Sequence, residues 1–240
     1  FEGILATLVN EYGSDNRRVG AALHNLGIVH LRAGNMNDAV DAIEEAVKIR
    51  KSTLGANHPK VSDSLVELGI VLLSQEEFED SIDTFNEALS IRERQIEKSK
   101  KGGTDERQIN QQIAKINNNI GCAYYEYGDL SNAKEIFKET LELQTEISRT
   151  AKHKASVPEM LTMSSIICNI GQVHLENNEW QQASIEFQKA LELQESILNS
   201  KLATDNDILL ATRENLAYSA IKYGSYDFAK QIYKEILHIH

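Results

Sequence analysis

The chain has 240 residues and a formal charge of −11 at pH 7, which disfavours nucleic acid and anionic membranes because both attract basic surfaces. Its two cysteines cannot form a disulfide framework and fit a reducing, cytoplasmic location. No run approaches 18 apolar residues, so no membrane-spanning helix is expected.

Helical periodicity extends through the whole chain, and no segment alternates apolar and polar residues as a strand does. Residues 1–12 are predicted to be the second helix of a truncated repeat, because residues 1–27 align without a gap with residues 43–69. Five helix–turn–helix repeats are expected to follow at about residues 17–56, 57–102, 105–152, 157–203 and 205–240, in one continuous array over residues 1–240. Gly34, Gly128 and Gly224 separate the two periodic stretches of their repeats, where a glycine with positive φ ends a helix.

Each repeat contains a small residue at the same place, which we call the anchor: Gly27, Gly69, Gly121, Gly171 or Ala217. A second small residue follows twelve places later: Ala39, Ser81, Ala133, Ala183 or Ala229. A large residue follows sixteen places after the anchor: Ile43, Phe85, Phe137, Phe187 or Tyr233. Small residues opposite large ones let two helix backbones approach closely. The pattern therefore predicts an all-α fold of interlocking antiparallel helix pairs, with an extended surface suited to binding.

The order L-G-x(6)-G-x(4)-A-x(3)-F-x(2)-A-L resembles the tetratricopeptide repeat. The first two anchors are 42 residues apart (69 − 27), which is longer than the usual 34-residue repeat. The bridge TLGANHPKVSDSLVELG at residues 53–69 resembles the L-G-x-x-H-P linker of kinesin light chain repeats, and ENLAYSAIKYGSYDFAKQIYKEIL is similar to a terminal repeat of that type. The resemblance covers nearly the whole chain at repeat level, and it implies a right-handed superhelical solenoid.

The same resemblance implies a protein–protein interaction scaffold that binds a peptide or helical segment of a partner in its concave groove, as a cargo adaptor does. The alternative is a regulatory or oligomerisation module whose groove is occupied by its own chain. None of the G-x-G-x-x-G, Gly-Lys-Ser/Thr phosphate-loop, H-E-x-x-H, C-x-x-C or G-x-S-x-G motifs occurs. We therefore expect no enzymatic activity, no cofactor and no metal site. His30 and His174 share one repeat position and are interpreted as packing residues.

The resemblance places the groove on the first helix of each repeat, at positions three and two before the anchor and one and four after it. The predicted partner-binding residues are His24, Asn25, Ile28, Leu31, Val66, Ile70, Leu73, Asn118, Asn119, Cys122, Tyr125, Asn169, Gln172, Asn215 and Tyr218. The asparagines two before the anchor either hold a ligand backbone, since an amide both donates and accepts, or bridge neighbouring repeats. Glu67, Glu126 and Glu176 near this path favour basic flanking charge on the partner.

Two further features offer alternative contacts. Basic loops at residues 98–101 and 149–154 stand out from the acidic background, either as solvated turns or as a binding face. At the chain ends, apolar residues are expected to lack a neighbouring helix and to support self-association: Phe1, Ile4, Leu8, Ile232, Ile236 and Ile239.

Overall fold

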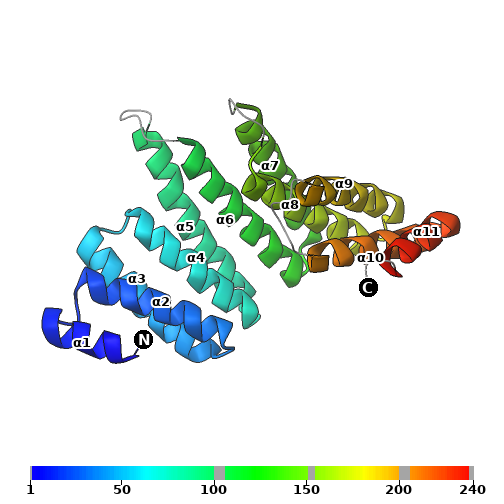
Figure 1. The fold of residues 1–240 in the computed structure, drawn as a ribbon. Helices are drawn as coiled ribbons and strands as arrows, with labels where there is room; N and C mark the ends of the chain where they lie inside the picture. Colours follow the sequence, from blue (N-terminus) through cyan, green and yellow to red (C-terminus); the bar gives the residue numbers. More distant parts are fainter. Residues whose placement is uncertain (1, 100–105, 151–154, 200–205, 238–240) are drawn as a thin grey trace. The chain divides into compact units, whose positions relative to one another are not determined.

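The structure is a computed structural model that describes residues 2–99, 106–150, 155–199 and 206–237. These residues form eleven α-helices and no strand, and Figure 1 shows them in chain order. The chain divides into two compact units, Phe1–Tyr127 (unit 1) and Gly128–His240 (unit 2). The boundary falls between the two helices of the third predicted repeat, so the single array over residues 1–240 stays a prediction.

Unit 1 contains six helices that pack against their neighbours in sequence. They are α1 (Glu2–Tyr12), α2 (Arg17–Arg32), α3 (Met36–Leu54), α4 (Pro59–Ser74), α5 (Phe78–Ser99) and α6 (Glu106–Tyr127). Unit 2 contains α7 (Leu130–Thr150), α8 (Val157–Glu176), α9 (Trp180–Asn199), α10 (Asn206–Lys222) and α11 (Tyr226–Leu237). The all-α prediction is confirmed, and each predicted repeat contains two helices. None of the described helices combines the length and the apolar character needed to cross a membrane.

The turns inside the repeats share one backbone feature, a positive φ seven residues after the anchor. Gly34, Gly128 and Gly224 have φ of 80°, 89° and 92°, which confirms their predicted role as helix terminators. Glu76 and Asn178 hold the same place in the other two repeats, with φ of 64° and 59°. An L-residue is strained in this region, so these two turns are less favourable than the glycine turns.

The interlocking of small and large residues is confirmed in three repeats. A Cβ added to Gly27 would overlap the side chain of Ile43, one added to Gly69 would lie 2.6 Å from Phe85, and one added to Gly171 would lie 2.8 Å from Phe187. The second small position closes the same contact, because the hydroxyl of Ser81 donates to the carbonyl of Gly69 at 2.8 Å. These side chains form the core between the paired helices.

The fifth repeat departs from the prediction. Tyr233 is 41% exposed, whereas Ile232 and Ile236 are 4% and 9% exposed and pack with Leu216 and Ala217. The expectation that Ile232 and Ile236 would lack partners is therefore wrong. Ile232 and Ile236 stand fifteen and nineteen places after the anchor, where Ala42 and Ala46 of the first repeat are also buried, with exposed fractions of 8% and 0%.

The other predicted end residues differ in their surroundings. Ile4 is 60% exposed, as expected, and Leu8 is partly buried. Phe1 and Ile239 lie outside the described residues. On α11, Leu237 and Tyr226 are 74% and 69% exposed.

Candidate partner-binding face

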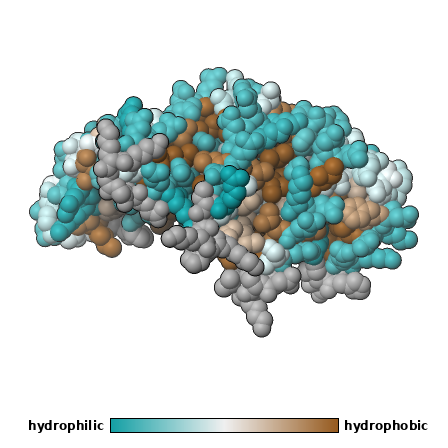
Figure 2. Space-filling model, turned by 90° about the horizontal axis from the view of Figure 1, so that it is seen from above, coloured by the Kyte–Doolittle hydropathy of each residue, from teal (hydrophilic) through white to brown (hydrophobic). Residues whose placement is uncertain are grey.

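The predicted groove residues of unit 1 lie on α2, α4 and α6, and α4 contacts both of the other two helices. One place after the anchor and four places after it, all six side chains are apolar or aromatic and only partly buried. These residues are Ile28, Leu31, Ile70, Leu73, Cys122 and Tyr125, which we call the apolar face of unit 1. Figure 2 shows that hydrophobic side chains emerge in patches from an otherwise hydrophilic surface.

Partial exposure distinguishes this face from the packing side of the same helices. Val61 and Val71 on α4 are 0% exposed, whereas Ile70 and Leu73 keep part of their surface in water. A side chain that served packing alone could be covered as completely as the valines are. The apolar face therefore retains surface that a ligand could bury.

The asparagines two before the anchor lie beside this face. Asn25 is exposed, Asn119 and Asn215 are partly buried, and the described part of the chain gives none of the three a side-chain hydrogen-bond partner. In α4 the same place holds Glu67, whose pKa is raised by burial despite the opposing charge of Arg32.

His24 occupies a polar cluster between two repeats rather than an open groove. Its ring lies 3.3 Å from the hydroxyl of Ser64 on α4. Arg50, which is 5% exposed, donates to the same hydroxyl at 2.6 Å and to the carbonyl of Lys60 at 2.8 Å. Burial and the charge of Arg50 lower the pKa of His24 from 6.5 to about 4, so the ring is neutral at pH 7.

Cys168 occupies the equivalent cluster in unit 2. The amide of Gln194 donates to Ser164 at 2.9 Å and to Thr212 at 3.0 Å, and the thiol lies 3.6 Å from Thr212. Burial raises the pKa of Cys168, so the thiol stays protonated and weakly reactive. This cluster joins the α8–α9 pair to α10, as the His24 cluster joins α2–α3 to α4.

The His24 and Cys168 clusters were not predicted from the sequence, although the sequence contains a signal for them. Twenty-three places after the anchor, four repeats have a long polar residue at the same position: Arg50, Arg92, Gln144 and Gln194. All four are buried, with exposed fractions of 5%, 7%, 1% and 4%. A buried polar residue needs partners, so its recurrence predicts a repeated hydrogen-bonded contact.

The remaining predicted residues behave differently in the two units. Val66 and Asn118 are partly buried in unit 1, whereas Asn169, Gln172, Asn215 and Tyr218 belong to unit 2. Tyr218 is 45% exposed and meets the Trp180 ring edge-on at 6.4 Å, with the Lys222 ammonium 5.3 Å from the Tyr218 ring. The structure therefore divides the predicted residues into one set on each unit.

His174 is the most deeply buried of the histidines that the structure describes. His174 is 8% exposed and pairs with Glu179, to which Lys134 donates at 3.0 Å, as expected for a packing residue. Over the ranges that the structure describes, no group of three His, Cys, Asp or Glu side chains could hold a metal ion. Residues 100–101 and 151–154 of the two basic loops lie outside the described residues.

Comparison with known proteins points to one repeat type. Residues 4–94 and 114–146 match models of the tetratricopeptide repeat, which together span just over half of the chain. No curated protein matches the chain in sequence.

Solved structures of similar fold come from several sources. A Podospora anserina protein named as a kinesin light chain with nearly identical TPR-like repeats has 16% identity and a TM-score of 0.67, with 93% of this chain and 94% of that chain covered. BtubC (BKLC) from P. vanneervenii has 16% identity and a TM-score of 0.71, over 99% of this chain and 85% of its own. The Rap conjugation regulator of plasmid pLS20, solved with the Phr* peptide, has 17% identity and a TM-score of 0.61, with 89% of this chain and 51% of that chain covered. At these identities the likeness is one of fold.

Proposed function

This chain belongs to the tetratricopeptide repeat family, and we propose that it is a protein–protein interaction scaffold that binds a peptide or helical segment of a partner on the apolar face of unit 1. One observation carries the proposal: partly exposed apolar side chains recur at two equivalent places on the neighbouring helices α2, α4 and α6. Because the same apolar positions repeat on three successive helices of a solenoid, they suit a linear ligand better than a compact one.

The spacing of the helices sets the spacing of the ligand's anchors. Packed helices lie about 8–10 Å apart, and an extended chain advances about 3.3 Å per residue. In an extended peptide, the apolar side chains that contact successive helices would therefore be about three residues apart. An amphipathic helix rises about 1.5 Å per residue, so its contacting apolar side chains would recur about every six or seven residues.

Polar residues beside the apolar face favour particular ligand residues around the apolar side chains. Asn25 and Asn119 each offer a donor and an acceptor, which suits the backbone of any peptide. Glu126 is exposed at the end of α6, and Glu67, two places before the anchor of α4, interacts with the charge of Arg32. These carboxyl groups favour a ligand whose flanking residues are basic. The peptide-bound Rap protein supports a peptide as the class of ligand, and the kinesin light chain-like neighbours support an adaptor role.

A second candidate is an oligomerisation module. The observation that favours it is the exposed apolar surface of α11, where Leu237 and Tyr233 are 74% and 41% exposed. Such a module would place apolar residues of one copy against another copy, and the groove would then not need a foreign ligand.

Selection of displayed random peptides against the wild-type chain tests the proposal. We expect enriched peptides to have apolar anchors flanked by basic residues and to lose at least fivefold in affinity with Leu73→Asp or Tyr125→Ala, which corresponds to about 1 kcal/mol. The matched control is Asn86→Asp, which adds a charge to an exposed position on α5. Equal losses in the control and groove variants, or affinity unaffected by both groove variants, would contradict the proposal.

A further inference from the structure

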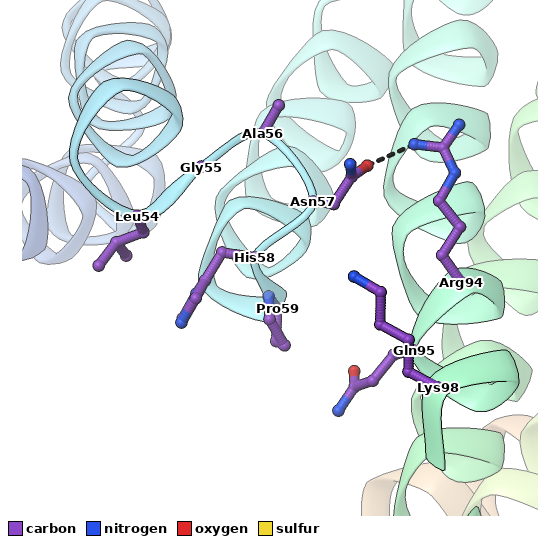
Figure 3. Close-up of a pocket in the computed structure, with 9 residues that line it drawn as sticks. All are labelled: Leu54, Gly55, Ala56, Asn57, His58, Pro59, Arg94, Gln95 and Lys98. Carbon is purple, nitrogen blue, oxygen red and sulfur yellow. Dashed lines mark hydrogen bonds between the residues drawn. The ribbon is translucent and has the colours of Figure 1, made fainter. Parts of the chain in front are cut away.

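A separate cavity of about 380 Å³ lies away from the apolar face, at the loop that joins α3 to α4. Leu54, Ala56 and Pro59 line one side of it, and Arg94, Gln95 and Lys98 of α5 line the other (Figure 3). We call it the 54–59 cavity. Its volume is within the range of pockets that bind small ligands or single side chains.

Hydrogen bonds and backbone conformations of its own residues fix the loop that forms this cavity. Gly55 ends α3 with φ of 90°, and the backbone N–H of His58 donates to the Gly55 carbonyl at 3.0 Å. The Nδ1 of His58 accepts from the backbone N–H of Lys60 at 3.1 Å and so caps α4, while Pro59 begins that helix. Three of the fixed residues of L-G-x-x-H-P, namely Gly55, His58 and Pro59, thus shape the loop. The two variable positions, Ala56 and Asn57, stand at the rim, where they can tune a ligand site.

The charges around the cavity are unbalanced. Neighbouring cations have partners: Lys51 pairs with Glu87 at 2.7 Å, and Lys60 pairs with Asp63 at 3.1 Å. Lys98 is exposed and has no ion pair with any described residue. In Figure 3 its ammonium end points toward the loop, and Arg94 donates to Asn57 beside it. No acidic residue lines the cavity, although the whole chain has a formal charge of −11.

We propose that the 54–59 cavity binds an acidic segment of a protein partner, with an apolar side chain against Leu54 and Pro59 and carboxylates against Lys98 and Arg94. The apolar floor favours a peptide segment over a free anion, because a free anion would leave that surface uncovered. This site is distinct from the apolar face, whose carboxyl groups favour basic flanks. A partner that contacts both would have basic and acidic segments in order along its chain.

A chemical-shift titration of the ¹⁵N-labelled chain at low ionic strength tests this site. The probes are the capped peptide EELEE, its neutral analogue QQLQQ and inorganic phosphate. EELEE is expected to shift the backbone resonances of Ala56 and Asn57, and QQLQQ to shift them weakly. Lys98→Gln should weaken EELEE about two- to fivefold and Lys98→Glu about tenfold, as loss and reversal of one exposed charge pair imply.

The controls separate this site from the alternatives. Lys138→Glu makes the same charge change at an exposed position of α7 and should leave EELEE affinity unchanged. Leu73→Asp alters the apolar face and should also leave it unchanged, so failure of this proposal and failure of the groove proposal are distinguishable. Equal binding of QQLQQ, equal weakening by Lys138→Glu, loss with Leu73→Asp, or phosphate shifts of equal affinity at the same residues would each overturn it.

Discussion

Gly69→Ala tests the register of the repeats, because the new methyl group would enter a fully occupied contact. Its Cβ would lie 2.6 Å, 2.7 Å and 2.9 Å from three carbons of the Phe85 ring, and Phe85 is 0% exposed. Non-bonded carbon atoms pack best at about 3.5–4.0 Å. The ring must therefore move by about 1 Å in a place without free space.

Two opposing effects set the size of the loss. Overpacking of a core typically costs about 1–3 kcal/mol. Replacing glycine with alanine inside a helix returns about 1 kcal/mol of helix propensity. We expect Gly69→Ala to lower the free energy of unfolding by about 0–2 kcal/mol, which is the overpacking loss reduced by the propensity gain. Gly3→Ala is the matched control, because nothing lies within 4 Å of its added Cβ in α1. That variant should be unchanged or slightly more stable.

Equilibrium urea unfolding followed by far-UV circular dichroism measures both variants. A double variant with Phe85→Leu should recover part of the loss, with a coupling energy of about 0.5–3 kcal/mol, as residues in contact show. If Gly69→Ala is as stable as the wild type and shows no coupling to Phe85→Leu, then α4 and α5 do not pack in the register described above.

Three more predictions follow from individual residues. Glu76→Gly should raise the free energy of unfolding by about 0.5–1 kcal/mol, because the φ of 64° at this position strains an L-residue. Urea unfolding measures this change, and a loss of stability would contradict the predicted strain. The folded-state pKa of His24, about 4, lies below its ordinary 6.5, so protonation favours the unfolded chain and stability falls as the pH drops from 6.5 to 4. Allowing for solvent around the ring, we expect a loss of about 1–2 kcal/mol that His24→Gln abolishes; equal pH slopes for the two proteins would refute it. Leu237→Glu should reduce concentration-dependent association in sedimentation velocity, because Leu237 is 74% exposed, and a wild type that stays monomeric at high concentration would exclude that role.

The helix pairs were predictable from the sequence because their signals are local. The helical period, the terminator glycines and the small–large matching of Gly69 with Phe85 each lie within one repeat. The fifth repeat was mispredicted because the pattern singles out the large residue sixteen places after the anchor, whereas Ile232 and Ile236 are the residues buried with Leu216 and Ala217.

The candidate site was only partly predictable, because exposure depends on neighbouring repeats. The apolar positions on α2, α4 and α6 follow from the resemblance to the tetratricopeptide repeat, which places the groove on the first helix of each repeat. The role of His24 does not, since it depends on Arg50 and Ser64, which approach it only in the folded chain. The charge imbalance at Lys98 was also hidden, because the sequence does not show which of the neighbouring lysines have carboxylate partners in space.

Site-specific photo-crosslinking tests the central claim most directly. A benzophenone amino acid is placed at position 70 on the apolar face and, in a second variant, at position 86 on the outer side of α5. A selected peptide ligand should crosslink at Ile70 and not at Asn86, and unlabelled ligand should compete the product away. Crosslinking at position 86 with none at position 70 would contradict the assignment of the apolar face of unit 1 as the binding surface.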